Sequence, residues 1–102
     1  NEPCDHFPVM THEVKLTEMT REANKRFFSS IDEVPTAAVT MGVGTVMAAR
    51  KIVMVITGAD KADILYKVFF GPVTPEVPGS ILQFHHDVTL ICDEAAAARM
   101  PQ

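Results

Sequence analysis

The chain has 102 residues, of which 47% are apolar and 22% are charged, and its formal net charge is −4. This length allows one domain at most, and the apolar content is too high for a disordered tail. The isoelectric point near 5.4 and the lack of a basic stripe argue against a nucleic-acid binder. The apolar stretch over residues 37–49 is too short to span a membrane, and we expect no signal peptide.

The cysteine and histidine content indicates a reducing compartment and no metal. Two cysteines, Cys4 and Cys92, are too few for a disulfide framework, so we expect a cytoplasmic protein. The histidines lack the spacing that places two zinc ligands on one helix face. They are His6, His12, His85 and His86.

The first third of the chain predicts a short strand and then a helix. Residues 14–16 alternate as in a strand, and Thr17 or Thr20 can cap a helix that runs to about residue 28. Met19, Ala23 and Phe27 recur at helical spacing, so we expect them to face a core. Residues 32–35 end in a proline that breaks the helix.

The middle of the chain predicts a repeated change between strand and helix. Residues 37–41 are small or β-branched and predict a buried strand, followed by a turn over 42–45 and a short helix over 45–50. Residues 52–56 are apolar on both sides, as in a parallel sheet covered by helices. Residues 60–70 predict a helix with an apolar side, which consists of Ile64, Leu65, Val68 and Phe69.

The last third adds a further strand. A proline-rich loop leads to a helical turn over 80–84, residues 88–92 form a third apolar strand, and the alanines at 95–98 favour a short helix. This order predicts an α/β fold with a parallel sheet of about three strands and flanking helices. Ligands bind beyond the carboxyl ends of such strands, which here means residues 42–45, 57–61 and 93–94.

Lys61 and Arg26 are candidate phosphate ligands. A lysine in the first turn of a helix opposes the helix dipole, and the start of a helix beside a lysine suits a phosphate. The plain alternative for Lys61 is an ion pair with Asp60 or Asp63. Arginine suits bidentate phosphate binding, but Glu22 stands four residues before Arg26 and offers an ordinary surface pair.

The glycine pair in the turn at residues 42–45 does not predict nucleotide binding. Gly42 and Gly44 match the first two glycines of a dinucleotide-binding fingerprint, but Met47 stands at the third. Two glycines in a turn between a strand and a helix more often serve tight geometry.

Several stretches together resemble the C-terminal part of the glucosamine-6-phosphate deaminase family, also called glucosamine-6-phosphate isomerase. The most specific are a Thr-Arg-Glu-Ala-Asn-Lys-Arg-Phe-Phe run and the Gly-Val-Gly-Thr turn that follows it at the right distance. The resemblance covers nearly all of residues 1–94. The matching stretches are residues 1–3 (Asn-Glu-Pro), 20–28, 34–35, 40–45, 58–61 and 87–94.

The resemblance implies the C-terminal portion of a three-layer, Rossmann-like deaminase/isomerase domain. It also implies an enzyme that converts an amino sugar phosphate to fructose 6-phosphate and ammonia without metal or cofactor. By position, Glu2 resembles the glutamate that orients a ring-opening histidine, and Arg26 and Lys61 resemble the cations that hold the substrate phosphate. The partners implied are a sugar phosphate and neither nucleic acid nor membrane.

Two departures from the family qualify this expectation. The ring-opening histidine, its aspartate, the proton-transferring aspartate and the first phosphate loop are expected upstream of residue 1, so we expect the chain alone to be inactive. The loop over residues 4–12 lacks the basic residues of the allosterically regulated members.

Removal of the upstream half should expose a strand edge and an apolar face, through which the chain associates with its missing half or a second copy. The alternative function is a sugar-phosphate-sensing domain of a transcription regulator, without catalysis.

Overall fold

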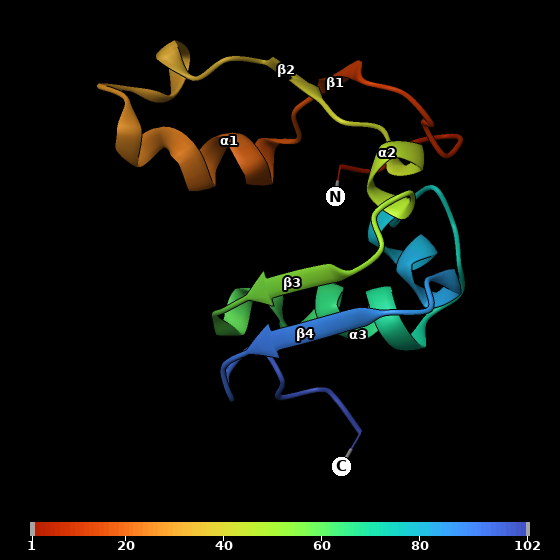
Figure 1. Ribbon diagram of the computed structural model, residues 1–102. Helices are drawn as coiled ribbons and strands as arrows, with labels where there is room; N and C mark the ends of the chain where they lie inside the picture. Colours follow the sequence, from red (N-terminus) through yellow and green to blue (C-terminus); the bar gives the residue numbers. More distant parts are fainter. Residues whose placement is uncertain (1, 102) are drawn as a thin grey trace.

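A computed structural model describes residues 2–101 of the chain, and Figure 1 shows that they form two parts. Asn1, the first residue of the Asn-Glu-Pro stretch, lies outside the described residues. We call residues 12–40 the arm and residues 51–101 the body. A short helix, α2 (Val43–Met47), joins them.

The arm consists of two paired strands and the helix between them. Strand β1 runs antiparallel to β2, with His12 opposite Thr40 and Lys15 opposite Ala37. The Thr17 side chain accepts a hydrogen bond from the Thr20 amide at 3.3 Å and so caps α1, as predicted. The elements of the arm are β1 (His12–Lys15), α1 (Glu18–Asn24), the 3₁₀ turns η1 (Lys25–Phe27) and η2 (Ile31–Glu33), and β2 (Ala37–Thr40).

Two expectations for the arm are wrong. The strand predicted at residues 37–41 is neither buried nor part of a parallel sheet, because β2 pairs with β1 and Val39 is 74% exposed. The predicted core side of α1 also faces solvent, with Met19 79% and Phe27 67% exposed. Both errors have one cause: helical and strand spacing identify an apolar face but not what covers it.

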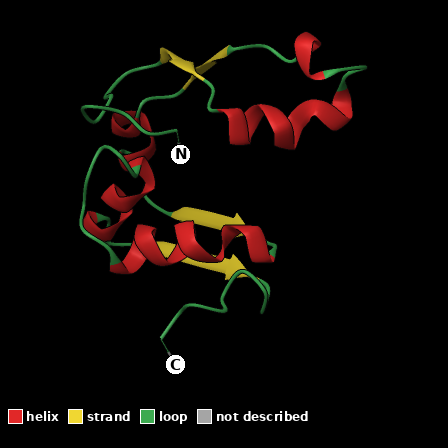
Figure 2. Ribbon diagram, turned by 180° about the vertical axis from the view of Figure 1, so that it is seen from behind, coloured by secondary structure: helices red, strands yellow, loops and turns green. Residues whose placement is uncertain are grey.

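The body has the α/β arrangement that the sequence predicts. Strand β3 (Ile52–Ile56) runs parallel to β4 (Val88–Cys92), with Ile52 opposite Val88 and Ile56 opposite Cys92. Helix α3 (Ala62–Phe70) connects them and lies across one face of the pair (Figure 2). The fold is therefore α/β, although the parallel sheet of the described residues has two strands rather than three.

The two faces of the β3–β4 pair differ in burial. Met54 and Ile56 on the α3 side are half-buried, and the predicted apolar side of α3 is confirmed, with Leu65 and Val68 fully buried. Side chains on the other face are exposed: Val53 is 54%, Val55 67% and Ile91 53% accessible. No described element covers this face, so the expectation of a sheet covered on both sides is not met within residues 2–101.

Helix α2 is anchored to the loop that precedes β1. The amide of Val43 donates to the Pro8 carbonyl at 2.7 Å, and that of Gly44 donates to the Val9 carbonyl at 3.1 Å. A Cβ atom at Gly42 would lie 2.3 Å from the carbonyl carbon of Val9, so this approach requires glycine. The helix begins two residues earlier than predicted.

The C-terminal segments match the sequence in part. The predicted helical turn is a longer 3₁₀ helix, η4 (Pro78–Phe84), which packs on α3. The alanine run forms a series of turns instead of a helix, with bonds such as the Ala97 amide to the Asp93 carbonyl at 3.1 Å.

Candidate functional site

The carboxyl ends of β3 and β4 lie side by side, and the residues that follow them meet. The amide of Gly58, which follows β3, donates to the carboxylate of Asp93, which follows β4, at 3.1 Å to Oδ1 and 3.2 Å to Oδ2. Two of the three predicted ligand positions, residues 57–61 and 93–94, therefore come together. The third, residues 42–45, follows β2 and so belongs to a different sheet.

The turn after β3 places Lys61 at the start of α3. Gly58 has φ = +98°, a left-handed conformation that favours glycine, and its carbonyl accepts from the Lys61 amide at 3.1 Å. Lys61 is exposed, and in residues 2–101 no ion pair joins it to Asp60 or Asp63. Asp63 instead accepts from Arg99 at 2.6 Å. The ion-pair alternative for Lys61 is thus not realised.

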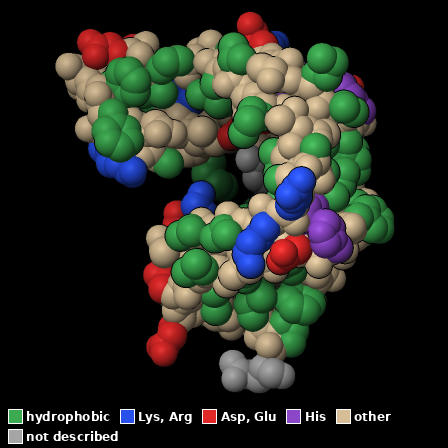
Figure 3. All heavy atoms as spheres, in the orientation of Figure 1, with side chains coloured by type: hydrophobic (Ala, Val, Ile, Leu, Met, Phe, Trp, Pro, Cys, Tyr) green, Lys and Arg blue, Asp and Glu red, His purple; other side chains and the backbone are tan. Residues whose placement is uncertain are grey.

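Lys61 lines a hollow of about 570 Å³ between the arm and the body. Figure 3 shows the hollow, with basic side chains on the arm above it and on the body below. Its lining combines apolar, hydroxyl and charged side chains. From the arm side it includes Glu2, Thr17, Met19 and Thr20, and from the body Ile56, Asp60, Lys61 and Lys67.

Arg26 lies in η1 on the arm and is exposed. Its Nη1 donates to the Ala23 carbonyl at 2.9 Å, and its guanidinium lies 4.5 Å from the centre of the Phe27 ring. Glu22, the alternative partner of Arg26 in a surface pair, instead pairs with Lys25 at 3.1 Å. Arg26 is not among the residues that line the hollow, so its convergence with Lys61 on one phosphate stays a prediction.

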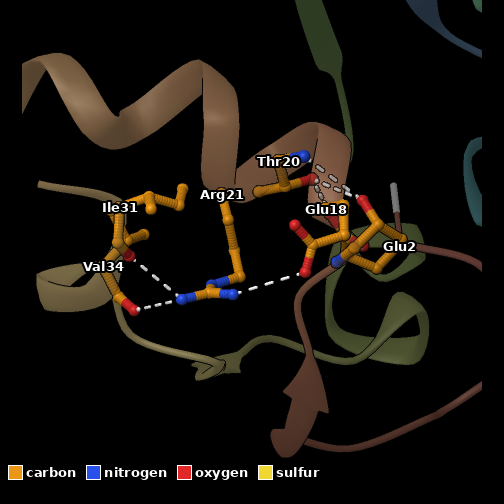
Figure 4. Close-up of polar contacts among 7 residues, drawn as sticks. Glu2, Glu18, Thr20, Arg21, Ile31 and Val34 are labelled. Atoms are coloured by element: carbon orange, nitrogen blue, oxygen red, sulfur yellow. Dashed lines mark hydrogen bonds and ion pairs between the residues drawn. The ribbon is translucent and has the colours of Figure 1, made fainter.

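Glu2 is fixed at the start of α1 (Figure 4). Its Oε2 accepts from the Thr17 amide at 3.0 Å, and its Oε1 accepts from the Thr20 hydroxyl. Both carboxylate oxygens are therefore engaged, while the side chain still borders the hollow. The sequence identified both threonines only as helix caps, because a contact across 15 to 18 residues leaves no periodic signal.

Arg21 fixes the far end of the same arm (Figure 4). Its Nη2 donates to the carbonyls of Ile31 and Val34 at 3.1 and 3.2 Å, and its Nη1 pairs with Glu18 at 3.3 Å. One guanidinium thus links α1 to the loop that leads into β2.

Two of the histidines, His85 and His6, have structural roles. His85 Nδ1 accepts from the Asp87 amide at 3.0 Å, so Nε2 carries the proton that the Ala49 carbonyl accepts at 2.7 Å. In the loop before β1, a hydrogen bond from His6 lowers the pKa of Asp5. Within the described range, no group of three His, Cys, Asp or Glu side chains could hold a metal ion, and both cysteines are free.

No helix between residues 2 and 101 is long and apolar enough to cross a membrane.

Known proteins match almost the whole of this chain. It is 51% identical over 100 residues to a glucosamine-6-phosphate deaminase of Clostridioides difficile and 54% identical over 100 residues to one of Streptococcus thermophilus, in both cases over 98% of the chain. It spans only 40% and 43% of the length of these relatives. No protein-family model matches the chain.

A solved structure described as a monomeric glucosamine-6-phosphate deaminase of the NagB superfamily has the same fold. It superposes with a TM-score of 0.87 at 42% sequence identity, over 95% of this chain and 40% of the other.

Proposed function

The chain belongs to the glucosamine-6-phosphate deaminase family, and on that premise we propose that the whole protein converts glucosamine 6-phosphate to fructose 6-phosphate and ammonia. The observation that carries this proposal is the identity of about half of all positions with deaminases, over 98% of the chain. Residues 1–102 are then the C-terminal part of one sugar-phosphate deaminase domain.

In this proposal, Lys61 and Arg26 hold the substrate phosphate. Lys61 fits this role because it stands at the carboxyl end of β3, borders the hollow and has no ion-pair partner among the described residues. Arg26 fits because Glu22 is paired elsewhere and because guanidinium groups bind phosphates bidentately. A dianionic phosphate also compensates the unfavourable position of a lysine at the start of a helix.

Glu2 is proposed to orient the ring-opening histidine. A carboxylate can hold a histidine in one tautomer only if the carboxylate itself is fixed. The Thr17 amide and the Thr20 hydroxyl supply that constraint on Glu2.

Substitution of the two cations tests the proposal. In the whole protein, Lys61→Ala and Arg26→Ala are each expected to raise KM for glucosamine 6-phosphate by ~10- to 100-fold, since a charge-assisted hydrogen bond contributes ~1.5–3 kcal/mol. Steady-state kinetics of ammonia release measures this. Lys51→Ala is the matched control, because the ammonium group of Lys51 pairs with Asp87. Wild-type KM in both test variants would refute the roles assigned to Lys61 and Arg26.

We further propose how the uncovered surfaces are used and where the protein acts. The exposed face of β3–β4 is covered by the rest of the domain in the whole protein, and by a second copy when the chain is alone. The chain alone is expected to release no ammonia, because the resemblance places the proton-transferring aspartate upstream. The two free cysteines suit a cytoplasmic location.

A further inference from the structure

We propose that Asp93 is a positioning residue for phosphate binding, which it serves by holding the turn that presents Lys61. This inference rests on the proposed function, because it assumes that Lys61 binds the phosphate of the substrate. Asp93 itself need not touch that phosphate. Its effect would pass through the backbone of the turn after β3.

The carboxylate of Asp93 joins two segments that are 35 residues apart. Both of its oxygens accept from the Gly58 amide, at 3.1 and 3.2 Å, and Oδ1 also accepts from the Ala96 amide at 2.8 Å. One side chain therefore fastens the turn after β4 to the turn after β3. These bonds stand at the edge of the sheet where the register places Ile56 beside Cys92.

The orientation of Gly58 decides where Lys61, the residue directly before α3, is placed. Gly58 has φ = +98°, and its carbonyl accepts from the Lys61 amide at 3.1 Å. A glycine peptide has wide conformational freedom unless a partner fixes it, and Asp93 fixes the amide of this one. In residues 2–101 no ion pair holds the Lys61 ammonium, so its direction depends on the backbone that carries it.

Because Asp93 is charged, the direction in which the Kd of phosphate changes on its substitution distinguishes two explanations. A carboxylate near a phosphate site repels the ligand, so a purely electrostatic role predicts tighter phosphate binding when Asp93 is neutralised. A positioning role predicts the opposite for any change that releases Gly58. The two explanations therefore predict changes in Kd of opposite direction.

The experiment compares Asp93→Ser with Asp93→Asn in the whole protein. Serine keeps a hydroxyl for the local bond to the Ala96 amide, but it is too short for the bond to Gly58. Asparagine removes the charge but keeps a carbonyl oxygen for the Gly58 amide. We expect Asp93→Ser to raise the Kd of inorganic phosphate and KM for the sugar phosphate roughly tenfold with kcat little changed, and Asp93→Asn to stay within about threefold of wild type.

Calorimetric titration with inorganic phosphate measures Kd, and hydrogen exchange measures protection of the Gly58 amide. Asp93→Ser should lose this protection and Asp93→Asn should keep it. Glu76→Ser is the control, since it removes the same charge from an exposed residue outside the predicted ligand positions and should leave Kd unchanged. An unchanged or lower Kd in Asp93→Ser, or an equal rise in Glu76→Ser, overturns the inference.

Lys61→Ala in the same titration separates this inference from the proposed function. If Lys61→Ala weakens phosphate binding but Asp93→Ser does not, only the role of Asp93 fails. If Lys61→Ala binds phosphate as wild type does, the proposed phosphate site itself is wrong.

Discussion

At the scale of single residues, the chemistry of this chain depends on polar side chains whose partners are distant in sequence. Glu2 is held by Thr17 and Thr20, and Gly58 is held by Asp93. In both cases a carboxylate accepts from a backbone amide and fixes the geometry of a neighbouring group. Such bonds add modestly to stability but strongly restrict orientation.

Thr20→Val tests the anchoring of Glu2. The substitution removes the hydroxyl that donates to Glu2, so the free energy of unfolding of the chain should fall by about 1 kcal/mol. The Thr17 amide, which also donates to Glu2, should lose part of its protection from hydrogen exchange. Urea unfolding and exchange measure these two effects.

Thr20→Ser is the control for this prediction, because it keeps the hydroxyl and should leave stability and protection close to wild type. Equal behaviour of the valine and serine variants would show that the hydroxyl does not hold Glu2.

The sequence predicted the candidate residues of the site but not their environments. Lys61 could be found because a lysine at the start of a helix after a buried strand is locally unfavourable, which is a signal in a single segment. Arg26 was a candidate from the chemistry of its guanidinium, Glu2 needed the family resemblance, and Asp93 was identified only as part of an expected ligand position at the end of a strand. The bonds of Glu2 to Thr17 and of Asp93 to Gly58 join distant segments and have no signature in the spacing of residues.

At the scale of elements, the sequence predicted the strands and the helix of the body closely, but it did not predict the strand pairing and the exposed faces of the arm. The apolar run of β3 and the 3.6-residue pattern of α3 each identify an element and its buried side. Strand β2 is also rich in apolar residues, but it pairs antiparallel with β1 (residues 12–15). Composition therefore predicted that both segments are strands, whereas their pairing depends on which other strand is within reach.

Gly42→Ala tests the junction at α2. The added methyl group would lie 2.3 Å from the Val9 backbone, and that backbone cannot retreat without losing the bond from the Gly44 amide. We expect a loss of about 1–3 kcal/mol in the free energy of unfolding, measured with urea.

Thr45→Ala serves as the control for that measurement, since Thr45 is an exposed position of α2 and should change stability by less than about 0.5 kcal/mol. Similar losses in the two variants would mean that the tight contact with Val9 is unimportant.

At the scale of the whole molecule, large apolar side chains remain exposed on both parts. On the body they form the open face of β3–β4, with Val53, Val55 and Ile91, and on the arm they include Met19 and Phe27. Exposed apolar surfaces of this kind mark sites of association. The share of the relatives that this chain spans, 40% and 43%, is consistent with a missing cover for these surfaces.

Sedimentation velocity tests this explanation on the 102-residue chain. We expect species larger than a monomer whose proportion rises with concentration. Val55→Lys places a charge in the middle of the open face and should shift the chain toward monomer. Thr45→Lys adds the same charge on α2, away from that face, and should not. A wild-type chain that sediments as a compact monomer at all concentrations would refute the explanation.

The anchoring of α2 has a mechanical consequence for the hollow between the arm and the body. Glu2 lines the upper side of the hollow and Lys61 the lower side, and the chain between these sides passes through α2, which is bonded to Pro8 and Val9 (Figure 1). A slight rotation at α2 would therefore cause a larger change in the distance between the far end of the arm and the far end of the body. The width of the hollow would then be set by a helix of five residues that does not line it.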